Sequence, residues 1–398
     1  MMTPSSPPGP ARRAARPLLT WIKLIAALIL AAILAVLMLG SSAPNSIPVA
    51  PAAVTATPPD DLTPIALPAT PTVDRRSPTP VLPPDTYIPG HIYYVQGQAI
   101  YSVHHNEAPQ LITTGSEPAL SPDGKQLAFI LFSKNYQDLW LLNLKTHTLT
   151  RLLDDALTDW QNASTGLTAA MPAWSADGQS VLFSWSYPGA PIAGTNNFDR
   201  TDFSITRCLA VGPCNTNTAV KLTTPAFQSG GDYDAAPRPG DPTVMVYARY
   251  LYETARDNTS RSLAYLVALN PTTLSAIQLT PFLDNDSQPT WSPDGKYLLY
   301  MKTSDDMRQT SIWEMAFHPP GDLQDNANAH LLISGSPFAA DPAFSPDGKD
   351  LAYLATGDDG RLHLYIAQIH LGTNPRIDHV QEVRRAGIVD GDRVIWGH

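Results

Sequence analysis

The sequence has few charged side chains and almost no cysteine. Asp, Glu, Lys and Arg make up 16% of its 398 residues, and only two residues are cysteines. The charges are also unbalanced, because 36 acidic residues against 26 basic ones give a formal net charge of −10. A nucleic-acid-binding surface needs an excess of basic side chains, so this composition predicts no nucleic-acid partner.

Motifs that carry catalysis or bind metals are missing as well. The chain has no Gly-x-Ser-x-Gly elbow, and its ten histidines are scattered, with only His104 and His105 adjacent. No histidine stands at a zinc-like spacing from cysteine or acidic residues. Acidic pairs such as Asp305-Asp306 suit solvated turns as well as calcium sites. We therefore predict no catalytic residue, no bound metal and no cofactor.

An unbroken apolar run occupies residues 18–39, with Lys23 as its only charge. A helix of about 20 apolar residues crosses the hydrocarbon layer of a membrane. Arg12, Arg13 and Arg16 precede the run, and the positive-inside rule places such residues in the cytoplasm. The pattern predicts a single-pass cell-membrane protein with a cytoplasmic tail at 1–17, a transmembrane helix at 18–39 and the remainder outside.

Proline is abundant, with 39 residues, and is concentrated in the segment that follows the apolar run. Residues 40–89 are rich in Pro, Ala and Thr and show no hydrophobic periodicity, which predicts a disordered linker. The alternative is a cleaved signal peptide, because Ser41-Ser42-Ala43 has the small residues that a signal peptidase accepts. Both interpretations export residues 90–398.

Residues 90–398 contain an internal repeat. Pro118 begins PALSPDGKQLAF, and similar segments begin at Pro172, Pro289 and Pro342, with a degenerate copy at Pro237. The spacing of 53 to 64 residues suits one propeller blade and its loops. In three copies Ser-Pro-Asp-Gly, and in the copy at Pro172 Ser-Ala-Asp-Gly, has the composition of a tight turn between two strands. The turn residues are Ser121, Pro122, Asp123, Gly124, Ser175, Asp177, Gly178, Ser292, Pro293, Asp294, Gly295, Ser345, Pro346, Asp347 and Gly348.

Each repeat reads as a four-stranded meander, and the two ends of the region read as parts of one blade. Residues 91–113 contain only the later strands of a blade, whereas residues 386–396 look like the start of a unit with Asp390-Gly391 as its turn. Pairing these ends would close a ring and remove exposed sheet edges. We predict an all-β fold with six blades.

The repeat residues resemble the TolB-like, PD40 (WD40-like) family of six-bladed β-propellers over roughly residues 90–398. Because these residues are the ones the fold needs, the resemblance carries over no catalytic role. The family includes protein-binding propellers, which implies a non-enzymatic binding or scaffolding module that contacts a protein or cell-envelope ligand. It also includes enzymes, so a carbohydrate- or peptide-active enzyme that uses the central funnel is the alternative. A sensor acting through residues 1–17 is a third possibility.

Loop lengths predict where such a module binds. In a meander, the second-to-third and blade-to-blade loops share one face, and the long loops fall there, including 154–170, 187–202 and 250–261. Binding residues concentrate on long loops of rigid scaffolds. The candidate binding-face residues are Trp160, Trp185, Tyr187, Phe198, Tyr250 and Tyr252.

The two cysteines, Cys208 and Cys214, flank a predicted hairpin, CLAVGPC. An exported location permits a disulfide between them. Two free buried thiols are the alternative, and the sequence leaves both open.

Overall fold

The computed structural model describes residues 87–398 apart from 106, 133–136, 154–167, 187, 192–197, 201–202, 216, 226–229, 255–259, 283 and 336. The predicted tail, transmembrane helix and most of the linker therefore lie outside the described residues. Within those residues, no helix is long and apolar enough to span a membrane.

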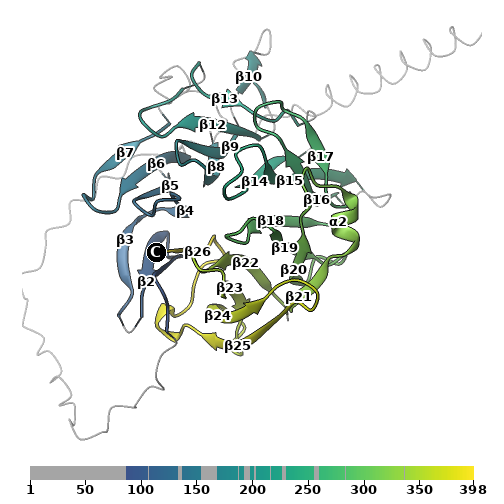
Figure 1. Cartoon of the computed structure of the whole chain (residues 1–398). Coiled ribbons are helices and arrows are strands. Elements are labelled where there is room, and N and C mark those ends of the chain that lie inside the picture. The colour runs from purple at the N-terminus through teal and green to yellow at the C-terminus, as the bar shows by residue number, and fades with distance from the viewer. Residues whose placement is uncertain are drawn as a thin grey trace, which may run out of the picture. The chain divides into compact units, whose positions relative to one another are not determined.

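The described chain is a six-bladed all-β propeller, with the blades arranged around a central axis (Figure 1). The first blade combines both ends of the region: strand β26 (Ile395–Gly397) is innermost, followed by β1 (His91–Gln96), β2 (Ala99–Val103) and β3 (Gln110–Thr114). The pairing of Ile92 with Trp396 joins the two ends. The predicted ring closure is confirmed.

Blades 2 to 6 each begin at the axis and run outward through antiparallel strands. Blade 2 comprises β4 (Ser116–Leu120), β5 (Gln126–Phe132), β6 (Gln137–Asn143) and β7 (Leu149–Arg151). Blade 3 comprises β8 (Thr168–Trp174), β9 (Ser180–Ser186), β12 (Ser204–Leu209) and β13 (Val220–Lys221), with the hairpin β10 (Pro188–Pro191) and β11 (Phe198–Arg200) inserted. Blade 4 comprises β14 (Gly231–Pro237), β15 (Met245–Thr254), β16 (Ser260–Leu269) and β17 (Ala276–Gln278).

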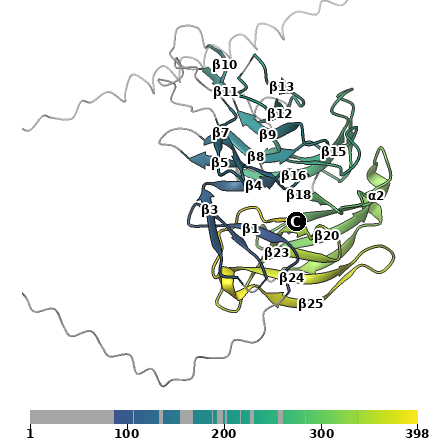
Figure 2. The same cartoon turned by 60° about the vertical axis from the view of Figure 1, so that its left-hand side comes forward.

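The last two blades complete the ring. Blade 5 comprises β18 (Asp286–Trp291), β19 (Tyr297–Thr303), β20 (Thr310–Ala316) and β21 (His330–Ser334), with the short helix α2 (Leu323–Ala327) inserted. Blade 6 comprises β22 (Ala339–Phe344), β23 (Asp350–Thr356), β24 (Leu362–His370) and β25 (Arg376–Glu382). The 3-10 helix η2 (Arg384–Ala386) follows, and the chain then returns to the axis as β26 (Figure 2).

The hydrophobic core lies between neighbouring blades. One cluster joins blades 2 and 3 through Ile130 and Phe183, and another joins blades 4 and 5 through Val246 and Tyr300. The cluster that includes Tyr94, Leu354 and Trp396 joins blade 6 to blade 1. Successive side chains of a strand point to opposite faces of its sheet, and both faces are buried against neighbouring blades, as a propeller requires.

Two details of the repeat differ from the sequence interpretation. In the degenerate copy, the backbone N–H of Asp241 donates to the carbonyl oxygen of Arg238, so Arg238 and not Pro239 takes the serine position. The segment Asp390-Gly391 precedes β26 and is not a hairpin turn. The two inner strands of this blade are β26, which ends at Gly397, and β1, which begins at His91, so no turn connects them. Both errors arise where the turn composition departs from Ser-Pro-Asp-Gly.

A disulfide joins Cys208 at the end of β12 to Cys214, with the Cα atoms 6.0 Å apart. Both residues are buried in the cluster between blades 2 and 3. The enclosed loop is short, so its cross-link restricts the unfolded chain only modestly.

We expect the double variant Cys208→Ser, Cys214→Ser to lose about 2 kcal/mol of unfolding free energy. Alkylation of the denatured, unreduced protein followed by mass measurement should show no added group, and prior reduction should allow two. Because the chain has no other cysteine, two additions without reduction would mean that the thiols are free.

Candidate functional site

The Ser-Pro-Asp-Gly turns are held by the same contacts in each blade that carries the motif. Ser121 Oγ donates to Asp123 Oδ1 at 2.7 Å and accepts from the backbone N–H of Gln126 at 2.9 Å. Gly124 has φ +70, a conformation that costs little only for glycine. The equivalent serine-to-aspartate distances are 2.6 Å at Ser175, 2.7 Å at Ser292 and 2.9 Å at Ser345. These motif residues shape the turns and are structural.

A pocket of about 510 Å³ lies on the axis, between these turns. We call it the funnel. Its rim includes Pro122, Pro293 and Pro346 from the turns, and its wall includes residues at the ends of the inner strands, such as Leu120 and Phe344. The volume lies within the range of small-ligand and peptide pockets, roughly 300 to 1,000 Å³.

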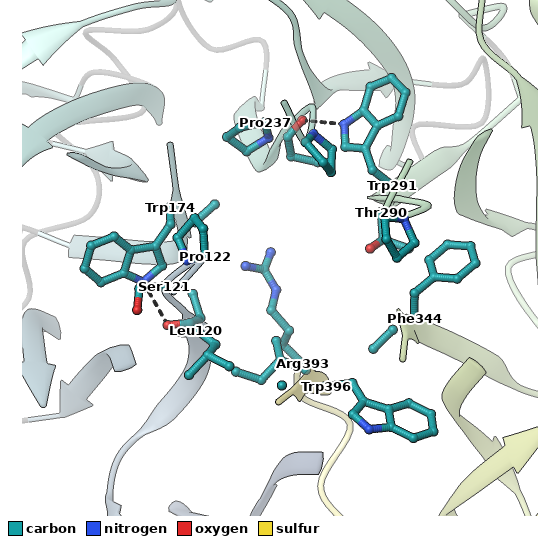
Figure 3. A pocket seen from close by; sticks show the side chains of 18 of the residues that line it. Leu120, Ser121, Pro122, Trp174, Pro237, Thr290, Trp291, Phe344, Arg393 and Trp396 are labelled. Atoms are coloured by element: carbon teal, nitrogen blue, oxygen red, sulfur yellow. Dashed lines mark hydrogen bonds between the residues drawn. The ribbon is translucent and has the colours of Figure 1, made fainter. Parts of the chain in front are cut away.

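Three tryptophans stand around the funnel (Figure 3). The indole Nε1 atoms of Trp174, Trp291 and Trp396 donate to the carbonyl oxygens of Ala119, Ala236 and Pro89, at 3.0, 2.8 and 2.7 Å. Each of these bonds ties the tryptophan to a neighbouring segment of the ring. The three side chains are only 6 to 8% exposed. They fix the shape of the funnel and offer only their edges to a ligand.

Deeper in the channel, the inner strand of each of blades 2 to 6 carries a β-bulge. One non-glycine residue in each bulge has a positive φ between 50 and 57°, a region that such residues seldom occupy. A bulge re-aims the side chain at its position. These residues, which with Asp392 we call the channel belt, are Glu117, Met171, Asp234, Gln288 and Asp341.

Side chains of the channel belt accept hydrogen bonds from the next backbone N–H around the ring. Asp392 Oδ2 accepts from Glu117 N at 3.1 Å, and Glu117 Oε2 accepts from Met171 N. Asp234 Oδ2 accepts from Gln288 N at 3.3 Å, and Gln288 Oε1 accepts from Asp341 N at 3.1 Å. The bonds therefore cross from blade to blade and lock the bulges together.

Arg393 bridges the place where the chain of hydrogen bonds is interrupted. The Met171 side chain has no strong acceptor, so the backbone N–H of Asp234 cannot donate to its neighbour in the same way. The Arg393 guanidinium donates instead to the carbonyl oxygen of Pro172 and lies 3.4 Å from Asp234 Oδ1. Figure 3 shows this side chain pointing into the middle of the funnel. The C-terminal segment thus contacts blades 3 and 4 as well as blade 1.

The channel belt contains four carboxyl groups, and the Arg393 guanidinium lies beside them. Burial raises the pKa of Glu117 to about 7, against the bond from Met171 N, which favours the anion. Burial, together with the repulsion of Asp392, raises the pKa of Asp341 to about 7. Burial also raises the pKa values of Asp234 and Asp392. Near neutral pH, the channel is therefore a proton-accepting and cation-attracting environment.

Asp341 is the carboxyl group at the open end of the hydrogen-bonded chain. Asp341 lines the funnel and is only 8% exposed. Its Oδ2 atom has no hydrogen-bond partner. In the part of the chain that the structure describes, no group of three or more His, Cys, Asp or Glu side chains is arranged to hold a metal ion.

The predicted binding face is described only in part. Trp160 and Tyr187 lie outside the described residues, and Phe198 and Tyr252 are placed on β11 and β15 by their backbone alone. Tyr250, on β15, packs edge-on against Tyr233 at 5.2 Å between ring centroids. Trp185 is only 2% exposed and belongs to the core between blades 2 and 3. For Trp185 the assignment to a binding surface is wrong, because its side chain fills an interblade space.

The sequence interpretation considered the funnel only as the site of the alternative enzyme and assigned the binding surface to the opposite face. Long loops indicated a binding surface on that opposite face, whereas the funnel is built from short turns and strand interiors. A usable signal was nevertheless present: each residue of the channel belt in blades 2 to 6 stands four positions before the serine or its equivalent, and four of the five are polar. Polar residues in a fixed place within otherwise apolar inner strands indicate a shared axis.

Comparison with known proteins gives the fold. The structure matches that of TolB from Acinetobacter baumannii with a TM-score of 0.52 and 18% sequence identity, over 77% of this chain and 66% of that one. The fold is that of a TolB-like β-propeller. The match spans just under two thirds of the length of that TolB chain.

Other solved structures share the arrangement more distantly. This TolB-like propeller matches a putative TolB from Agrobacterium tumefaciens at 15% identity, over 73% of this chain and 88% of that one, with a TM-score of 0.46. It matches an oligogalacturonate lyase from Vibrio parahaemolyticus at 14% identity, over 70% and 74% of the two chains, with a TM-score of 0.42. No protein-family model matches the sequence, and no curated protein matches it.

Proposed function

We propose that this chain is a non-enzymatic binding or scaffolding propeller that receives a protein or cell-envelope ligand in its funnel. The observation that carries the proposal is the funnel itself, an axial pocket of about 510 Å³ with a proline-rich rim. Its walls are fixed by the interblade hydrogen bonds of Trp174 and Trp291. A preformed, rigid pocket limits the entropy lost on binding, which favours capture of an extended segment.

The same proposal includes display outside the cytoplasm. The apolar run at 18–39, preceded by Arg12, Arg13 and Arg16, supports a membrane anchor, and the proline-rich segment at 40–89 supports a tether. A tethered module explores a limited volume, which raises the effective concentration of its site near the membrane. Its partners would then be found at or near the cell envelope.

The alternative function is an enzyme that acts on carbohydrate or peptide in the same funnel. The specific observation in its favour is the gathering of Arg393 with the carboxyl groups of the channel belt, two of which have pKa values raised to about 7. Three of the four carboxyl groups, however, accept backbone hydrogen bonds from neighbouring blades. That use supports a structural and binding role for most of the cluster.

Site-specific photo-crosslinking in intact membranes tests the funnel. A photoreactive phenylalanine analogue replaces one of three residues in the full chain: Pro122 on the funnel rim, Met307 in the opposite-face loop between β19 and β20, or Leu149 on an outer strand. We expect a defined crosslinked partner from Pro122 and none from Leu149. Capture from Met307 alone would contradict the funnel and support the loop face predicted from the sequence.

A further inference from the structure

We propose that the ligand entering the funnel presents a cationic side chain, lysine or arginine, to Asp341. The inference rests on the proposed binding function and adds the chemistry by which the funnel selects its ligand. It starts from Asp341 Oδ2, a buried carboxyl oxygen that has no hydrogen-bond partner and belongs to a residue that lines the funnel.

The unused atom follows from the connectivity of the channel belt. The belt carboxylates of Asp392, Glu117 and Asp234 are each used by the backbone N–H of a neighbouring blade. The backbone N–H of Asp341 donates to Gln288 Oε1, but Asp341 Oδ2 accepts no hydrogen bond from the next segment. A buried carboxyl oxygen without a donor is costly to the folded protein, and a ligand donor that reaches it removes that cost.

The charges around Asp341 decide the sign of the group that fits. Asp392, Asp234 and Arg393 all lie within electrostatic range of the Asp341 carboxyl. Arg393 is already engaged with Pro172 O and Asp234 Oδ1. With its one guanidinium engaged, the channel has no positive charge free for an anion, so once Asp341 is ionised an entering anion is repelled and an entering cation is attracted.

The shape of the funnel favours a cation at the end of an apolar stem. Pro122, Pro293 and Leu120 surround the path from the rim toward the channel belt. Proline has no backbone N–H, so Pro122 and Pro293 offer apolar surface and no backbone donor, and the Leu120 side chain adds to that surface. A lysine or arginine side chain places methylenes against such a wall while its charged end reaches the carboxylates.

The test uses the full chain in detergent with EDTA present, and the probes are acetylated, amidated hexapeptide libraries. One central position is fixed as Lys, Arg, norleucine or Glu, and the other positions are mixtures. Retained peptide is measured by equilibrium ultrafiltration and mass spectrometry. At pH 8 we expect the Lys and Arg libraries to be retained about tenfold better than the norleucine library, as suits one charged hydrogen bond.

Matched variants assign the preference to Asp341. Asp341→Asn removes the charge with little change in size, and the Lys-to-norleucine ratio should fall close to one. Asp286→Asn is the control, because Asp286 is also buried, has its pKa raised to about 7, and does not line the funnel. It should leave the ratio unchanged. In the wild type the ratio should fall as the pH drops below 7, because Asp341 must lose its proton to pair.

The outcomes separate this inference from the proposed function. In one outcome, the photoreactive group at Pro122 crosslinks retained peptides that show no preference for Lys or Arg. That result overturns the cationic selection and leaves the binding funnel standing. A preference that survives Asp341→Asn also overturns it. If no library is retained or crosslinked, the binding function itself is contradicted for peptide ligands. Should Asp341→Asn unfold, the wild-type ratio of Lys to norleucine still decides.

Discussion

Replacing Trp396 with alanine should lower the unfolding free energy by about 3 to 5 kcal/mol, the range typical of large aromatic truncations in cores. The side chain is only 8% exposed and packs in the cluster between blades 6 and 1. Its indole donates to Pro89 O at 2.7 Å, and its backbone pairs with Ile92. The variant removes packing and a hydrogen bond at the seam that closes the ring.

Urea denaturation monitored by far-UV circular dichroism measures the loss. Leu111→Ala is the control, because Leu111 lies on β3 of the same blade and is 60% exposed. It should cost well under 1 kcal/mol. Equal losses in the two variants would mean that the C-terminal strand contributes no more than an outer strand, and that the ring does not depend on its closure.

The seam also shows how far local sequence patterns predict this fold. The repeated turn places strands in order, and the partial blades at 91–113 and 386–396 predict that the ends share a sheet. The pattern misplaces the joining strand, because Asp390-Gly391 looks like a turn in composition. The position of β26 depends on Trp396 packing between blades 6 and 1, and such tertiary contacts leave no trace in turn composition.

The funnel was harder to predict because its residues come together only in three dimensions. Glu117 and Asp341 are 224 positions apart in the chain, and both face the axis because bulges turn their backbones into the left-handed region. Neither residue is glycine, so nothing in its local composition indicates that conformation. The aromatic residues drew attention to the opposite face, yet Trp185 proves to fill an interblade space.

The buried carboxyl groups predict that stability falls as the pH rises from about 4.5 to 7. Burial raises the pKa of Glu117 from 4.5 to about 7 and that of Asp341 from 3.8 to about 7. Between the unfolded and folded pKa values, the unfolded chain has lost protons that the folded chain keeps, so deprotonation favours unfolding. Below both values the penalty vanishes, and above pH 7 it is complete.

Each fully developed penalty is on the order of 3 to 5 kcal/mol, from about 1.4 kcal/mol per unit of pKa. Asp286, with its pKa also raised to about 7, adds to the same slope. The turn aspartates act in a different window: the pKa of Asp123 is lowered to about 2 by its bonds to Ser121 and Lys125, so its contribution is lost only below pH 4. The two classes of carboxyl group can therefore be separated by pH.

The double variant Glu117→Gln, Asp341→Asn should flatten most of this slope, because both amides keep an acceptor oxygen but cannot ionise. Urea denaturation of the wild type and the variant at pH 5, 6, 7 and 8 compares the two. We expect the wild type to lose stability from pH 5 to 7 and the variant to lose less, with a residual slope from Asp234, Asp286 and Asp392. Parallel curves would show that Glu117 and Asp341 titrate near their ordinary values, and the channel would then hold ionised carboxylates already at pH 5.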